Sequence, residues 1–232
     1  MHRFAVAAML LGTLVGAQVK ADVISSLFST GFNAGGTLAT EGSVDAHWTI
    51  VSNASGTGST AYITTTDGFP IGAWIPNQPN GQWIQPTSGS TDTHVPGVYT
   101  FQTQFSLAGF EANTASIQFT AAADNRITDV LINGFSTGFT WTGASGSGDA
   151  YASFSPQFTI SNPAFFQNGI NTLQFVVEND GPPNDPTNPT GLLVVLSGTA
   201  NPVPEPSTMI LVGLMGAGAF AVRRIRRGKN AA

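Results

Sequence analysis

The chain has 232 residues and a formal net charge of −5 at pH 7, a length that fits one or two domains. It contains no cysteine, which excludes disulfides, zinc–thiolate sites, iron–sulfur clusters and thiol nucleophiles. Between Asp22 and Asn201 there is one basic residue, Arg126, against twelve acidic ones, so this segment carries a charge of −11. Such a segment repels phosphate backbones and anionic membranes, and we expect no nucleic-acid partner.

The first 21 residues have the pattern of a secretory signal peptide. A short basic start ends at Arg3, and an apolar stretch of small residues follows over Phe4–Gly16. Small or apolar residues, Val19 and Ala21, occupy the two positions that a signal peptidase reads. We therefore expect a signal helix over residues 1–21 and a mature start near Asp22. The alternative is a buried N-terminal helix.

The segment 22–200 is predicted to be β throughout. Over Val98–Leu107, apolar and polar side chains alternate with the period of two that a strand covering a core requires. The expected strands are Val44–Val51, Ala61–Thr65, Val98–Leu107, Thr114–Ala122, Arg126–Ile132, Phe135–Trp141, Tyr151–Ile160, Asn171–Glu178 and Gly191–Gly198. Many short strands with frequent turns predict a single jelly-roll-like β-sandwich, with a closed barrel as the main competitor.

Two details refine this all-β prediction. Asn133-Gly134 between two expected strands is typical of a type I′ hairpin turn, because both central residues need positive φ. The nearly continuous apolar run in Gly191–Gly198 indicates a central strand.

The last segment, 201–232, combines a proline-rich motif, an apolar run and a basic end. Residues 208–222 are apolar or small, and we expect a transmembrane helix there. Fifteen residues fall short of the roughly 20 that span a bilayer core, although flanking side chains with long stems can reach the interface. A basic stop follows, which predicts a cytoplasmic C-terminus. It comprises Arg223, Arg224, Arg226 and Arg227.

This order of features resembles the PEP-CTERM sorting signal of Gram-negative bacteria. The residues that carry the resemblance are Val203, Pro204, Glu205 and Pro206, followed by the glycine-rich apolar run and the arginines. The resemblance implies processing by an exosortase, a membrane cysteine transpeptidase that reads the Pro-Glu-Pro residues. It also implies a precursor held transiently in the inner membrane and a mature body at the cell surface or in the extracellular matrix. The alternative is an ordinary C-terminal anchor with a proline-rich stalk.

The body also resembles galactose-binding-like β-sandwiches. Ala123-Asp124-Asn125, the Asn133-Gly134 turn and Asn171-Thr172-Leu173 carry this second resemblance. It implies a fold rather than a ligand. Such sandwiches often hold one structural Ca²⁺ ion, whose oxygen ligands would come from Asp124, Asn125, Asp180 or Asp185. The alternative for Asp124-Asn125 is local hydrogen bonding that ends a strand.

Three tryptophans, Trp74, Trp83 and Trp141, lie in or beside expected loops. Exposed aromatic rings stack on sugars, so an exopolysaccharide site is one hypothesis. The other is that these rings cap the open end of a sandwich.

No residue pattern in the body predicts catalysis. His47 and His94 are its two histidines, and no paired carboxylate accompanies them. We therefore expect a non-enzymatic surface or matrix protein. A carbohydrate-binding module is the second hypothesis and a secreted hydrolase the third.

Overall fold

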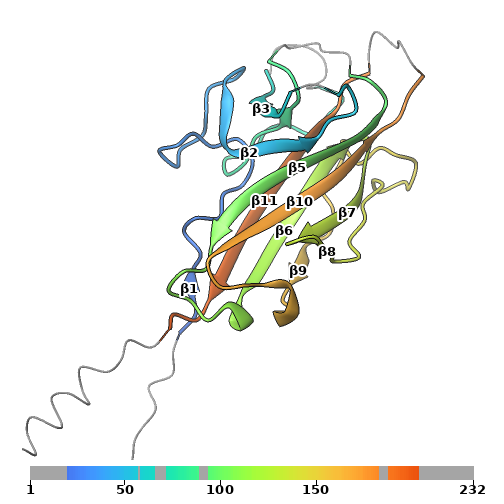
Figure 1. Cartoon of the computed structure of the whole chain (residues 1–232). Coiled ribbons are helices and arrows are strands. Elements are labelled where there is room, and N and C mark those ends of the chain that lie inside the picture. Colours follow the sequence, from blue (N-terminus) through green and yellow to red (C-terminus); the bar gives the residue numbers. More distant parts are fainter. Residues whose placement is uncertain (1–19, 57, 66–71, 89–93, 183–187, 204–232) are drawn as a thin grey trace, which may run out of the picture.

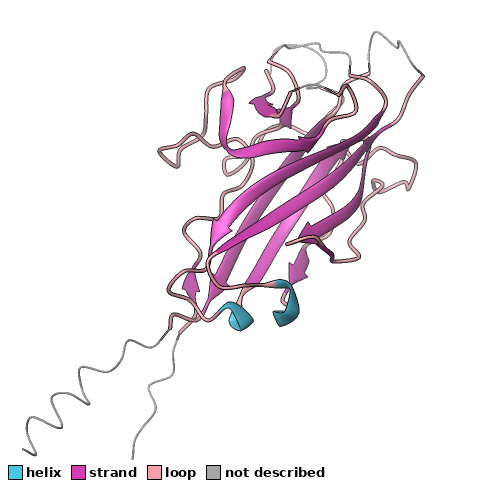
Figure 2. Cartoon of the chain, in the orientation of Figure 1, coloured by secondary structure: helices cyan, strands magenta, loops and turns pink. Residues whose placement is uncertain are grey.

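The computed structural model describes residues 20–56, 58–65, 72–88, 94–182 and 188–203. These residues form strands, loops and two single-turn 3-10 helices (Figures 1 and 2). The all-β prediction is therefore confirmed. No helix within the described ranges is long and apolar enough to cross a membrane. Residues 1–19 of the signal helix predicted over 1–21 lie outside the described residues, as does the transmembrane helix predicted at 208–222.

The strands belong to one connected sheet in the order β8-β7-β10-β5-β2-β3-β4-β11-β6-β9, and β1 pairs with β11. All these pairings are antiparallel. The strands are β1 (Asp22–Val23), β2 (Val44–Ser52), β3 (Thr60–Ile63), β4 (Ile84–Gln85), β5 (Gly97–Ser106), β6 (Ser116–Asp124), β7 (Arg126–Ile132), β8 (Phe135–Ser136), β9 (Phe158–Ile160), β10 (Ile170–Asn179) and β11 (Gly191–Ala200). The helices are η1 (Ala112–Thr114) and η2 (Pro163–Phe165).

The sheet curls so that its two arms face each other across one core. Phe119 of β6 and Phe175 of β10 meet with ring centroids 5.1 Å apart, and Trp48 of β2 lies 5.9 Å from Phe175. The arms therefore pack as in a sandwich. They are nevertheless joined, because two-residue β4 pairs with both β3 and β11. The expected pair of separate sheets is thus replaced by one curled, open sheet.

The alternation that predicted β5 is confirmed by burial. Tyr99, Phe101 and Phe105 are buried in the core, whereas Gln104 faces solvent. The Asn133-Gly134 turn is confirmed too, since Asn133 has φ 52° and Gly134 has φ 83°. Strand β11 lies between β4 and β6, as its apolar run predicted.

Two predicted strands are much shorter in the structure. The return strand Phe135–Trp141 is reduced to β8, and Trp141 makes only an isolated bridge to Ile127. The strand Tyr151–Ile160 is reduced to β9. Its first residues, including Tyr151 and Phe154, instead pack against a small cluster of buried side chains outside the main core. These partly buried rings pack on that cluster, and only residues 158–160 pair with β6.

Candidate functional site

The start of the tail is hydrogen-bonded to the folded body. After β11 ends at Ala200, the amide of Asn201 donates to Thr114 Oγ1 at 2.8 Å, and its carbonyl accepts from the Glu111 amide at 2.8 Å. Pro202 forms a bridge with Phe110, and the amide of Val203 donates to the Gly109 carbonyl at 2.8 Å. Residues 201–203 thus extend the sheet by one short ladder against the turn at 109–114.

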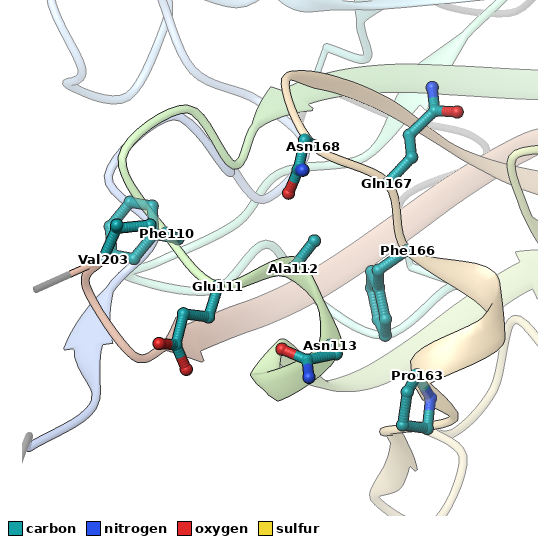
Figure 3. A pocket seen from close by; sticks show the side chains of 9 residues that line it. All are labelled: Phe110, Glu111, Ala112, Asn113, Pro163, Phe166, Gln167, Asn168 and Val203. Carbon is teal, nitrogen blue, oxygen red and sulfur yellow. The ribbon is translucent and has the colours of Figure 1, made fainter.

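A groove of about 510 Å³ lies beside this ladder. Figure 3 shows Phe110 and Val203 at one side of it and Phe166 and Pro163 at the other. Most of the lining is apolar or carries neutral amides, and one residue is charged. The lining residues are Phe110, Glu111, Ala112, Asn113, Pro163, Phe166, Gln167, Asn168 and Val203. The groove therefore contains the first residue of the predicted sorting motif in its wall.

The remaining residues of the predicted sorting signal lie outside the described part of the chain. They are Pro204, Glu205, Pro206 and the basic stop Arg223, Arg224, Arg226 and Arg227. Val203 is described, and its side chain is 51% exposed.

Two of the three tryptophans proposed for sugar binding are buried. Trp74 and Trp83 are 4% and 0% exposed, and their rings lie 4.3 Å apart. They cover Ala122 of β6 and Leu193 of β11, forming a second hydrophobic cluster on the outer face of these strands. Burial leaves neither ring a free face for a sugar. The other interpretation had these rings cap the open end of a sandwich; in the structure they cover the outer face of two strands instead.

The second cluster depends on close packing against a strand backbone. A Cβ at Gly191 of β11 would lie 2.7 Å from Trp74 Cη2, so only glycine fits beneath this ring. The third tryptophan, Trp141, is half-buried. Its Nε1 donates to the Ser153 carbonyl at 3.3 Å, and the ring packs against the main core.

Asp124 sits at the edge of the second cluster with little access to water. Its Oδ2 accepts a hydrogen bond from Trp74 Nε1 at 2.8 Å, and its main-chain carbonyl accepts from the Thr190 hydroxyl at 2.7 Å. Burial raises the pKa of Asp124 to about 7, although the Trp74 hydrogen bond opposes this and the nearby Asp180 charge adds to it. This carboxyl group is a structural acceptor with little solvation.

The neighbouring acids surround Arg126. Its guanidinium pairs with Glu178 at 3.0 Å and, by a short contact, with Asp180. Burial lowers the pKa of Arg126, but hydrogen bonds and charge interactions with these two acids outweigh it, so the pKa is raised. The carboxamide of Asn125 accepts from the Asp180 amide at 2.7 Å.

The structure therefore brings three of the four proposed calcium ligands together around an arginine. Asp124 and Asp180 already have the partners described above, and the Asn125 oxygen is used by a backbone amide. The fourth, Asp185, lies outside the described residues. Within the described ranges, no three His, Cys, Asp or Glu side chains are grouped to hold a metal ion.

Both histidines of the body take part in local structure. His94 is buried, its Nδ1 accepts from the Thr190 amide at 3.1 Å, and its Nε2 lies 3.1 Å from Thr87 Oγ1. His47 stacks on Phe28 with centroids 3.7 Å apart, and its Nε2 contacts the Asn33 carbonyl at 3.0 Å.

Sequence reasoning missed the residues that hold the tail. Gly109 has φ 83°, and a glycine two residues after the alternating strand predicted over Val98–Leu107 is a turn signal. Its pairing with Val203, nearly a hundred residues away, leaves no such local signal. The same holds for Thr114, whose hydroxyl receives the Asn201 amide.

A comparison with known protein families identifies the same sorting signal in the tail that the sequence analysis predicted. A family model described as the PEP-CTERM protein-sorting motif matches residues 202–227. The chain therefore carries this motif, which indicates an exported protein with a membrane-anchored precursor that an exosortase processes. No curated protein matches the chain.

Among solved structures, the body is similar to a family 11 carbohydrate-binding module from Clostridium thermocellum, determined in complex with a β-1,3-1,4-mixed-linked tetrasaccharide. The two share 11% identity, and the match covers 68% of this chain and 98% of that one with a TM-score of 0.30. A likeness this distant carries no argument about the ligand.

Proposed function

We propose that this chain is a non-enzymatic envelope or matrix protein whose β-domain is exported, anchored through residues 202–227 and then transferred to the cell surface or the extracellular matrix. The sorting motif is the observation that carries the proposal. The signal-peptide pattern at residues 1–21 supports it, because an exported β-domain needs a signal for secretion. A signal peptidase and an exosortase would be the two processing partners.

The roles of the histidines support a non-enzymatic body. A general base must present a free nitrogen to a nucleophile or a water molecule. His94 instead receives a backbone amide within the fold, and His47 lies stacked against Phe28. The carboxyl group with the largest described pKa change, Asp124, faces Trp74 rather than a cleft.

The test is to fractionate cells that express the wild-type chain or a variant with Pro204, Glu205 and Pro206 changed to alanine. We expect mass spectrometry to find a shortened C-terminus in the wild-type surface fraction and an intact tail in the variant, held in the membrane fraction. An intact tail on the wild-type protein in an exosortase-containing host would refute the proposal.

Binding to neutral exopolysaccharide is a second candidate, favoured by a shallow groove on the outer face of β6 and β11. Gln157 and Gln118 are joined there by a 2.8 Å amide hydrogen bond, and both are exposed. The groove has a volume of about 230 Å³, and its lining contains no charged residue. Neutral amides and hydroxyls are the groups that hydrogen-bond to sugar hydroxyls.

Polysaccharide pull-down would test this second candidate. We expect binding to fall when Gln118 and Gln157 are both changed to alanine. Trp74 and Trp83 are unsuitable for this purpose, because removing a buried ring would perturb the fold itself. Unchanged binding in the double variant, or no binding by the wild-type chain at high polymer concentration, would reject this site.

A further inference from the structure

Both membrane-directed segments leave the domain at the same end. Strand β1 pairs with the last residues of β11, so Asp22 lies opposite Ala200 and Val23 opposite Thr199. Antiparallel partners are only about 5 Å apart. The junction with the predicted signal peptide and the start of the sorting motif are therefore neighbours at one end of the molecule (Figure 1).

We call this the tail end and define it by residues 22–23, 109–113, 163–168 and 201–203. The far end is defined by residues 97–98, 124–126 and 178–180. The long strand β10 has ten residues and runs from Ile170, near the tail end, to Asn179. At 3.3 Å per residue, the two ends are separated by roughly 30 Å.

The connection between the tail end and the predicted membrane segment is very short. The last described residue, Val203, is fixed by its hydrogen bond to Gly109. Only four residues, 204–207, separate it from residue 208, where the predicted transmembrane helix begins. Even a fully extended chain spans roughly 17 Å over this interval. Because the headgroup layer itself is about 5 to 8 Å thick, little free distance remains.

The groove at the tail end carries little charge. Glu111 is its one charged residue, among neutral amides such as Asn113 and Gln167. Asp22 is the other acidic residue of the tail end. Because few charged groups have to approach the headgroups, the groove can lie against a lipid surface with little electrostatic repulsion.

From the short tether and this weakly charged groove, we propose that the tail end rests against lipid headgroups in the anchored precursor, with the groove at residues 110–113 and 163–168 facing the membrane. The far end, with the loops that surround Arg126 and the second hydrophobic cluster, is then the displayed surface. This inference rests on the proposed anchoring through the sorting motif.

The absence of cysteine from the sequence makes the inference directly testable. Asn113→Cys places a fluorescent label in the groove, and Val98→Cys places the same label at the far end, on a side chain that is 43% exposed. The full chain with its tail would be reconstituted into phosphatidylethanolamine–phosphatidylglycerol vesicles that contain a lipid with a quencher on its headgroup. We expect loss of fluorescence from the Asn113→Cys label and none from the Val98→Cys label.

A spacer variant tests whether the tether sets this geometry. Ten glycine and serine residues inserted between Val203 and Pro204 add an average reach of roughly 18 Å. We expect the quenching at Asn113→Cys to decrease in this variant although the chain still floats with the vesicles. Undiminished quenching would contradict the tether argument.

The outcomes separate this inference from the proposed function. A chain that does not float with vesicles would overturn the anchoring and, with it, this inference. A chain that floats but shows equal quenching at both labels, or none at either, would overturn only the orientation. If the Asn113→Cys label becomes shielded from solvent only after exosortase is added, the groove binds a protein partner instead of lipid. This outcome would also overturn the proposal.

Discussion

The far end and the tail end of the domain use the same strands in different ways. At the far end, β6 and β11 are covered on both faces, because Trp74 and Trp83 pack over Ala122 and Leu193 outside the main core. At the tail end, the same strands still bury Ile117 and Ala200 in the main core, and their further partners are narrow: β1 on β11, β9 on β6, and the turn at 109–114 on residues 201–203. One end is covered on both faces, and the other is a one-sided core that ends in a backbone ladder.

This difference implies that the far end contributes more to the stability of the domain than the tail end does. Buried aromatic side chains contribute several kcal/mol each, whereas a backbone hydrogen bond near water contributes about 1 kcal/mol. Residues 201–203 can therefore detach from the turn at 109–114 while the core stays folded. The far end, by contrast, should fail only together with the whole domain.

The largest expected effect comes from Trp83→Ala. The ring is fully buried against Trp74, and its Nε1 donates to the Ile75 carbonyl at 2.8 Å. We expect the free energy of unfolding to fall by about 3–5 kcal/mol, because a cavity and an unpaired carbonyl remain. Urea unfolding of the purified chain, followed by circular dichroism, measures this loss.

Trp141→Ala is the matched control, since this tryptophan is half-buried and packs only at the margin of the main core. Its effect should be clearly smaller. Equal losses in the two variants would contradict the assignment of the second cluster as a structural core. If Trp83→Ala does not fold, Trp83→Phe retains most of the packing and permits the comparison.

The next effect depends on pH and concerns Asp124. Its pKa is raised from 3.8 to about 7 in the folded protein, chiefly by burial. The folded state therefore retains a proton that the unfolded chain releases above pH 4. The stability that Asp124 contributes is complete below pH 4 and is lost as the pH rises toward 7, by at most on the order of 4 kcal/mol.

Asp124→Asn tests this prediction, because the amide stays neutral and its Oδ1 can still accept the Trp74 hydrogen bond. We expect the variant to gain stability relative to wild type between pH 4 and 7 and to match it at pH 4. Burial also raises the pKa of Asp45, but this carboxyl group is present in both proteins and cancels in the difference. If the free energies of unfolding of the wild type and the variant change in parallel with pH, then ionisation of Asp124 costs the folded protein no stability, and the prediction is wrong.

The main strands could be predicted from sequence because their signal is local. Alternation identified β5 through Tyr99 and Phe101, and two residues sufficed to identify the Asn133-Gly134 turn. The curl could not be predicted in this way. It depends on β4, whose two residues are too few to show a period, and on its pairing with strands far away in the chain.

The candidate sites also differ in whether a local sequence pattern identifies them. The sorting motif is a contiguous pattern, so the sequence alone located it correctly. The positions of Trp74 and Trp83 were harder to predict, since proline and glycine around them indicate a loop but not its direction. In the structure, this loop folds back over β6 and buries both rings. No local sequence pattern predicts the hydrogen bond between Val203 and Gly109 either.

The smallest effect is expected at the tail end, from Thr114→Val. The hydroxyl of Thr114 accepts from the Asn201 amide at 2.8 Å and donates to the Glu111 carbonyl at 2.7 Å, and valine preserves the shape while removing both bonds. We expect a loss of about 1 kcal/mol, confined to the ladder. Hydrogen exchange should quicken at the amides of Asn201 and Val203 and stay unchanged at Asn125, which lies at the far end. Equally faster exchange at both ends would mean that the ladder unfolds only with the core, and the contrast between the two ends would then be wrong.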